Sequence, residues 1–224
     1  MKTLKLWFVV LLTSQFIGAA IAWATDIFIF KISVAALGTV ILLIAYAHKL
    51  PKALDVWVVI IAFVCSMIGD YFLSHMHGDT TFFILGISLY LLAHIGYLTF
   101  SLLNGTLRWK SSIALTVVFL IFFYLALYPT LDDKTLAFMV LFYLIVSCVS
   151  LGAALGLKLE PTIKWPYVIG IALILFSDTI ISFTEFIHYD ALNFLILPTY
   201  YLAQIGITIA LYLKRTEAKA LPEN

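Results

Sequence analysis

Two aspartates inside otherwise apolar stretches of the sequence are the residues best placed to do chemistry. Asp70 stands in the segment SMIGDYFLS, and Asp178 stands in a similar segment, LILFSDTII, much later in the chain. A charged side chain at the centre of a bilayer costs about 2.5–3.5 kcal/mol on insertion scales, so such residues usually face one another or a wet cavity. Two carboxyl groups in an apolar setting can serve as a general acid and a general base. We therefore predict that Asp70 and Asp178 transfer protons.

Lys31 is the third charged residue inside the apolar stretches. At about 1.5 Å per residue, Lys31 and Asp70 lie at similar depths, about 7 Å from the same side of the membrane, and Asp178 lies deeper. The three side chains could therefore meet. They would then form either a structural tie between three helices or a site for proton chemistry. The paired placement of the aspartates favours chemistry, whereas for Lys31 both interpretations stay open because a lysine near the interface can snorkel to water.

The elements that must position these residues are transmembrane helices. Of 224 residues, 64% are hydrophobic and only 11% are charged, against about 25% charged in soluble proteins. The net charge of +1 does not indicate a basic surface that would bind nucleic acid. The sequence thus predicts an all-α integral membrane protein with one transmembrane domain over residues 1–224, because a lipid-exposed backbone must satisfy its own hydrogen bonds. Its eight predicted spans are 6–24, 27–47, 54–74, 82–103, 111–129, 135–156, 166–187 and 192–213.

The basic residues predict the orientation of these spans. With eight spans, one face receives both termini and the loops near 50, 107 and 160, together with eleven of the 13 lysines and arginines. The opposite face receives only Lys134. The positive-inside rule therefore predicts that both termini are cytoplasmic, and we expect the protein in a bacterial inner membrane. The first span, which ends in AIAWA, has some features of a cleaved signal peptide, but its length favours a retained helix.

The two halves of the sequence resemble one another. HKLPKALDVWVVIIAFVCSMIGD (48–70) aligns with LKLEPTIKWPYVIGIALILFSD (157–178), and YLLAHIGY (90–97) matches YYLAQIGI (200–207). Chance similarity between apolar segments is the alternative, but the shared polar residues favour duplication. Because four helices separate the copies, they run in the same direction. The sequence thus predicts a parallel 4+4 internal repeat.

Further polar residues accompany the aspartates. Ser74 and Ser182 each follow an aspartate by four positions and so share its helix face. His94 corresponds in the repeat to Gln204, which keeps hydrogen bonding but neither titrates nor binds metals as imidazole does, so positioning is expected rather than metal binding. Two tyrosines also occupy equivalent repeat positions. The predicted substrate-binding residues are Lys31, Ser74, Tyr90, His94, Ser182, Tyr200 and Gln204.

The order and spacing of these motifs resemble the YhhN/TMEM86 family of lysoplasmalogenases over residues 27–213. The shared features are eight spans, a lysine in the second (Lys31), GD late in the third and SD in the seventh. The resemblance implies an integral membrane hydrolase that cleaves the vinyl ether bond of lysoplasmalogens, giving a fatty aldehyde and glycerophosphoethanolamine or glycerophosphocholine. It implies catalytic roles for Asp70 and Asp178. The family pattern has a proline after the lysine, which the segment KIS (31–33) lacks.

This chemistry also suits the residues considered by themselves. A vinyl ether is hydrolysed by protonation of the carbon β to its oxygen, followed by capture of the oxocarbenium ion by water. One carboxyl group can donate that proton while a second, ionised one stabilises the cation and activates the water, as in glycosidases. No metal or organic cofactor is required. The expected partners are a lysophospholipid substrate and membrane lipids, with no nucleic acid and no obligate protein partner.

Four alternatives remain open at this point. A proton-coupled transporter of a small or lipid-like solute would also combine repeats with buried carboxylates, although the spans that hold the aspartates contain no internal proline. An intramembrane aspartyl protease would need a G-x-G-D motif, but Met67 stands at its first glycine. A zinc-dependent lipid amidase would use His75, His77 and His94. In a non-enzymatic protein, the aspartates would only hold helices together.

Overall fold

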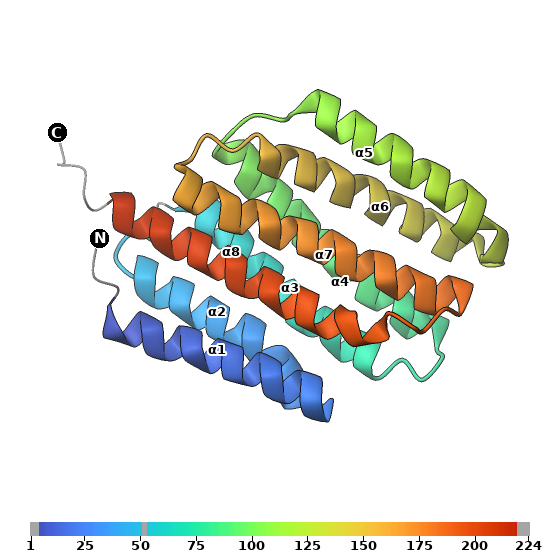
Figure 1. Ribbon diagram of the computed structural model, residues 1–224, viewed down its shortest axis with the longest axis horizontal. Coiled ribbons are helices and arrows are strands. Elements are labelled where there is room, and N and C mark those ends of the chain that lie inside the picture. Colours follow the sequence, from blue (N-terminus) through green and yellow to red (C-terminus); the bar gives the residue numbers. More distant parts are fainter. Residues whose placement is uncertain (1–4, 51–52, 219–224) are drawn as a thin grey trace.

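The protein is a bundle of long helices (Figure 1). The computed structural model describes residues 5–50 and 53–218, and this part of the chain contains eight helices that are long and apolar enough to cross a membrane, with no strand. The all-α transmembrane fold and its eight spans are therefore confirmed. The helices are α1 (Leu6–Thr25), α2 (Phe28–Tyr46), α3 (Leu54–Ser74), α4 (Thr80–Leu103), α5 (Trp109–Phe122), α6 (Lys134–Leu155), α7 (Pro161–Ile187) and α8 (Ile196–Ala218).

Most helix ends lie within a few residues of their predicted positions, but the predicted start of α7 is wrong by five residues, and so is the predicted end of the last span, since α8 continues from 213 to Ala218. The sequence predicts a break over the segment EPTIKWP, whereas the helix already begins at Pro161. Proline is well tolerated at the first position of a helix, because its missing N–H has no partner there in any case. Pro166, farther along, lies inside the helix, so the span that holds Asp178 does contain an internal proline, contrary to the prediction.

The fifth span also departs from a plain helix. α5 ends at Phe122 and continues as a π-helical segment, Phe123–Leu127, and then as a short 3₁₀ turn, Tyr128–Thr130. The predicted span of 111–129 covers all three pieces, because hydropathy does not distinguish one kind of helix from another.

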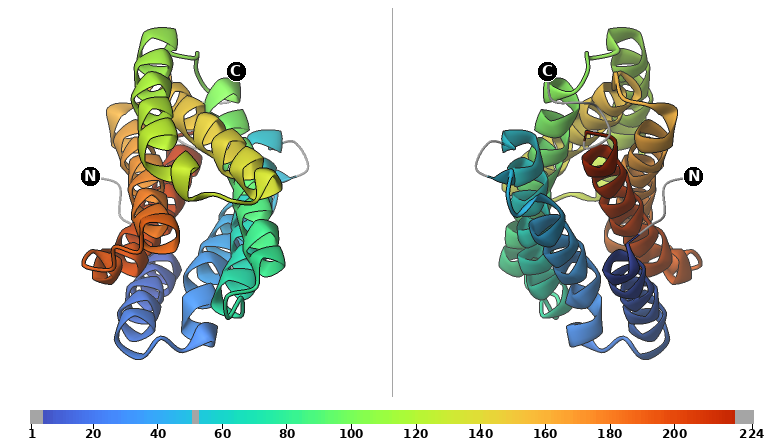
Figure 2. Two further views of the ribbon diagram at one scale, coloured as in Figure 1. Left: turned by 90° about the vertical axis from the view of Figure 1, so that its right-hand side faces the viewer. Right: turned by 90° about the vertical axis from the view of Figure 1, so that its left-hand side faces the viewer.

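The helices pack in the same pairs in both halves of the chain. α3 lies against α4 and α7 lies against α8; α2 contacts α3 and α8, and α6 contacts α7 and α4. α1 and α5 are the outer helices, at opposite edges of the bundle (Figures 1 and 2). The largest apolar cluster is formed mainly by α2, α3, α4, α7 and α8, so these helices are held firmly relative to one another.

Two equivalent glycines allow the same close approach in each half. A Cβ atom on Gly96 of α4 would lie 2.6 Å from the carbonyl oxygen of Val58 in α3, and one on Gly206 of α8 would lie 2.9 Å from that of Pro166 in α7. Val58 and Pro166 are themselves equivalent in the alignment of the two halves. This correspondence supports the parallel 4+4 repeat, which stays a prediction.

Candidate active site

Asp70 and Asp178 line one cavity in the half of the bundle that contains the α3–α4 and α7–α8 connections. The cavity has a volume of about 190 Å³, and its walls come from α2, α3, α4, α7 and α8. Lys31, Ser74, Tyr90 and Tyr200 also line it. The structure thus brings the two aspartates and four of the seven predicted substrate-binding residues to a common space.

Asp70 is held by two tyrosines. The Tyr90 hydroxyl donates to Oδ1 of Asp70, and the Tyr200 hydroxyl donates to Oδ2 at 3.5 Å. The two rings meet edge to face, with centroids 5.9 Å apart. Gly69 makes room for this arrangement, because a Cβ atom there would lie 3.2 Å from the Tyr90 ring. In the GD pair, Asp70 therefore supplies the carboxyl group, and Gly69 leaves room for the Tyr90 ring that binds it.

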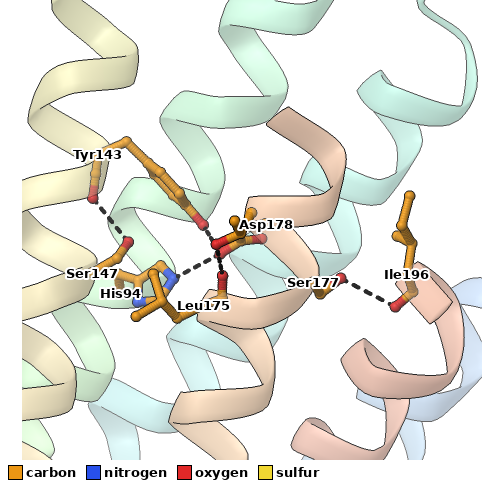
Figure 3. Close-up of polar contacts among 8 residues, drawn as sticks. His94, Tyr143, Ser147, Leu175, Ser177, Asp178 and Ile196 are labelled. Atoms are coloured by element: carbon orange, nitrogen blue, oxygen red, sulfur yellow. Dashed lines mark hydrogen bonds and ion pairs between the residues drawn. The ribbon is translucent and has the colours of Figure 1, made fainter. Parts of the chain in front are cut away.

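Asp178 is held from one side only (Figure 3). The Tyr143 hydroxyl donates to Oδ2 of Asp178 at 2.5 Å, and Nε2 of His94 lies 3.4 Å from the same oxygen. Oδ1 has no hydrogen-bond partner among the described residues. The imidazole of His94 is buried, and its Nδ1 atom also lacks a partner in the part of the chain that is described. One carboxyl oxygen of Asp178 is therefore free to meet a ligand.

Tyr143 is not among the residues predicted from the sequence. It lies nine residues inside α6, which begins at Lys134, and this places it about 13 Å from the end of the helix at 1.5 Å per residue. Tyrosines of the aromatic belt lie at the membrane interfaces. The depth of Tyr143 is therefore the signal that distinguishes it, because a hydroxyl group so far from water needs a partner.

Lys31 makes its ion pair with a neighbour on the surface. Its Nζ atom lies 2.7 Å from Oδ1 of Asp26, in the turn between α1 and α2. No ion pair joins Lys31 to Asp70 or Asp178 among the described residues. The structural interpretation, in which a lysine ties the two aspartates together, is therefore not what the structure contains. Lys31 remains one of the residues that line the cavity.

The remaining predicted residues lie at different distances from the cavity. Ser182 lines two narrower cavities that also reach Asp178, and its hydroxyl donates to the Thr179 carbonyl oxygen at 2.7 Å. Gln204 is fully buried one turn below Tyr200 and is not part of the cavity wall. Both polar atoms of its amide lack a partner in the described structure, and its predicted contact with substrate stays a prediction.

The three histidines of the amidase alternative do not gather at one point. His94 is buried against Asp178, whereas Nδ1 of His75 lies 2.8 Å from the Tyr71 carbonyl oxygen at the exposed end of α3. Among the described residues, no three histidine, cysteine, aspartate or glutamate side chains are grouped as ligands for a metal ion.

The model of the YhhN family matches residues 27–211 of the chain. The match extends from the start of α2 to the last turns of α8 and includes every residue of the cavity named above. No curated protein matches the sequence, and no solved structure matches it either.

Proposed function

The chain belongs to the YhhN family, and from this premise we propose that it is a membrane hydrolase that cleaves the vinyl ether bond of lysoplasmalogens. The family includes the TMEM86 lysoplasmalogenases. The observation that carries the proposal is the cavity shared by Asp70 and Asp178. Two carboxyl groups that face one space from different helices suit a reaction that needs both a proton donor and a proton acceptor.

The proposed reaction balances with water as the only co-reactant. A carboxyl group gives its proton to the alkene carbon β to the ether oxygen, which leaves an oxocarbenium ion. Water adds to the cationic carbon and loses a proton to the second carboxylate. As the hemiacetal breaks its original C–O bond, the second carboxyl group gives its proton to the departing ether oxygen and the first carboxylate takes the proton of the hemiacetal hydroxyl. The products are the fatty aldehyde and the glycerophospho alcohol; both carboxyl groups regain their starting protonation states, and one water is consumed.

The different surroundings of the two aspartates support different roles for them. Both oxygens of Asp70 accept a tyrosine hydroxyl, which leaves neither oxygen free to present a proton to a ligand. Asp178 keeps Oδ1 free, and donors on Oδ2 would stabilise the charge that develops as a proton leaves Oδ1. We therefore assign proton donation to Asp178, and cation stabilisation with water activation to Asp70.

Depth in the membrane agrees with this assignment. Asp70 lies four residues before the end of α3 at Ser74, and Asp178 lies nine before the end of α7 at Ile187, or about 6 Å and about 13 Å along the helices. In a lysoplasmalogen, the carbon that takes the proton is on the hydrocarbon side of the carbon that water attacks. The deeper carboxyl group is therefore the natural donor.

We also propose that both termini are cytoplasmic and that the cavity opens toward the opposite side of a bacterial inner membrane. The bias of the basic residues supports this orientation. Lysophospholipid is the proposed substrate and partner; the mechanism uses only side chains of this chain and water.

The test is aldehyde release by purified protein in detergent. A lysoplasmalogen and a saturated ether lysolipid of the same chain length are compared, and only the first should give aldehyde. Asp70→Asn and Asp178→Asn should each lower kcat/KM by at least about 100-fold, the range expected for loss of an acid or base, without loss of folded protein. No aldehyde from the unaltered protein would favour the transporter, since a carrier makes no product.

Rescue by a small nucleophile separates the two roles. Azide can capture an oxocarbenium ion without a base, so it should restore consumption of substrate in Asp70→Ala. It should not do so in Asp178→Ala, where the cation never forms. Rescue of Asp178→Ala alone would reverse the assignment.

A further inference from the structure

A narrow apolar crevice leads from Asp178 toward the lipid between α5, α6 and α7. A cavity of about 50 Å³ lies between these helices and adjoins one of about 60 Å³ between α3, α4, α6 and α7; both are lined by Val140, Tyr143, Asp178 and Ser182. Beyond this point the walls are Phe119, Phe122, Leu127, Leu144 and Leu175. We propose that this crevice binds the hydrocarbon chain of the lysolipid, an inference that rests on the proposed function.

The packing of α5 accounts for the crevice. α5 lies against α6, and the π-helical segment after it is the part of this span that packs on α7. At the boundary, the rings of Phe122 and Phe183 meet edge to face with centroids 5.4 Å apart. The outer surface of α5 is exposed and apolar, with Val118 and Ile121 facing away from the bundle. The crevice therefore lies where a chain can pass between protein and lipid.

The π-helical segment shapes the wall. Phe119 and Phe122 are three residues apart and share a face of the α-helix, and Leu127 follows Phe122 by five residues. In a π-helix, hydrogen bonds join residues five apart, so Phe122 and Leu127 come to the same side. In an uninterrupted α-helix, Leu127 would be turned away from this face. π-Helical turns are frequent at functional sites, and here the turn extends an apolar wall toward the site.

The opposite end of the path is polar. The cavity of the aspartates shares Met76, Phe83 and Glu185 with an outer cavity of about 540 Å³, which is also lined by Asp132 and His188. The order along the path is thus a wide polar space, the two carboxyl groups and a narrow apolar crevice. A lysoplasmalogen has the same order of headgroup, vinyl ether and chain.

Blocking the crevice should change the preference for chain length. Leu144→Trp fills it beyond Asp178, so kcat/KM for an 18-carbon alkenyl lysolipid should fall at least tenfold relative to an 8-carbon one. Phe122→Ala removes a ring from the wall and so widens the crevice. It should bring the kcat/KM values of the unaltered protein for the 18-carbon and 8-carbon lysolipids closer together. The matched control is Val118→Trp, on the exposed face of the same helix, which should leave the ratio unchanged. Thermal unfolding in detergent establishes that the variants are folded.

Cross-linking gives a readout that does not depend on turnover. A saturated ether lysolipid with a diazirine near the end of its chain is irradiated with the unaltered protein, and the labelled peptides are identified. Label on α5, α6 or α7 is expected, with loss of that label in Leu144→Trp. If the protein releases aldehyde but Leu144→Trp and Phe122→Ala change neither the labelling nor the chain preference, the crevice does not bind the hydrocarbon chain, while the proposed function stands. If no aldehyde forms in the unaltered protein, the proposed function itself fails.

Discussion

At the scale of single residues, the two aspartates differ mainly in how their oxygens are hydrogen-bonded. Asp70 accepts tyrosine hydroxyls on both oxygens, whereas Asp178 accepts one on a single oxygen. The donors to Asp178 come from α4 and α6, and those to Asp70 come from α4 and α8. The carboxyl groups are therefore fixed by helices other than their own, so that their geometry depends on the packing of the whole bundle.

Tyr143→Phe tests the hydrogen bond to Asp178. The substitution removes a hydroxyl group 2.5 Å from Oδ2 and little else. A hydrogen bond to a charged group is worth about 1.5–3 kcal/mol, so kcat should fall by roughly 10- to 100-fold while KM changes little. The measurement is steady-state aldehyde release, and the control is Tyr124→Phe, whose side chain is exposed on the π-helical segment. Equal activities of the two variants would show that Tyr143 has no part in the reaction.

Residue types and spacing predict both aspartates and the two tyrosine partners of Asp70 on α4 and α8, because a carboxyl group in an apolar span is conspicuous and the repeat points to its neighbours. They do not identify Tyr143, since tyrosines are common in membrane proteins and this one has no partner in the aligned segments. Lys31 is conspicuous for the same reason as the aspartates, but Asp26, in an adjoining turn, is its ion-pair partner. A long flexible side chain near an interface has several partners within reach, and the sequence does not rank them.

At the scale of helices, two close crossings set the positions of the acids. Gly96 lets α4 approach the backbone of α3, and Gly206 lets α8 approach that of α7. Small residues at such crossings are typical of helix packing in membranes. Hydropathy predicts where the helices lie along the chain, but not these crossings, which depend on shape. Two of its errors reach five residues, at the start of α7 and at the end of α8. The first comes from treating Pro161 as a terminator when it is an initiator.

Gly96→Ala should disturb the crossing of α3 and α4. The added Cβ atom would lie 2.6 Å from the Val58 carbonyl oxygen, which is backbone and cannot turn aside. Overpacking of this kind costs about 1–3 kcal/mol. The midpoint of thermal unfolding in detergent should therefore fall clearly below that of Leu92→Ala, a control on the lipid-exposed face of the same helix. An unchanged midpoint would mean that the two helices are not in close contact at this position.

At the scale of the whole molecule, the two ends of the bundle differ in charge. One end holds the start of α1, the end of α8 and most of the basic residues in the described part of the chain, and the other carries the wide cavity with Asp79, Asp132, Asp133 and Glu185 in its wall. The pattern of the basic residues can be read from the sequence. The cavity cannot, because its walls come from loops that are far apart along the chain.

Cysteine labelling in intact bacterial cells tests the proposed orientation. The native Cys65 and Cys148 are first replaced by alanine, and single cysteines are then introduced as Tyr189→Cys after α7 or Trp109→Cys at the start of α5. Both positions are exposed. A membrane-impermeant maleimide should label only Tyr189→Cys before lysis and both variants after it. The reverse pattern would place the cavity on the cytoplasmic side.

The two aspartates lie between a wide polar cavity and a narrow apolar one. This position bears on where the two products go after the proposed cleavage. Each fragment is already in contact with the medium that dissolves it. The aldehyde can diffuse away within the bilayer leaflet, while the water-soluble alcohol leaves through the mouth of the bundle. In the proposed reaction, the two products therefore leave in different directions, and neither fragment has to cross the path of the other before the next lipid enters.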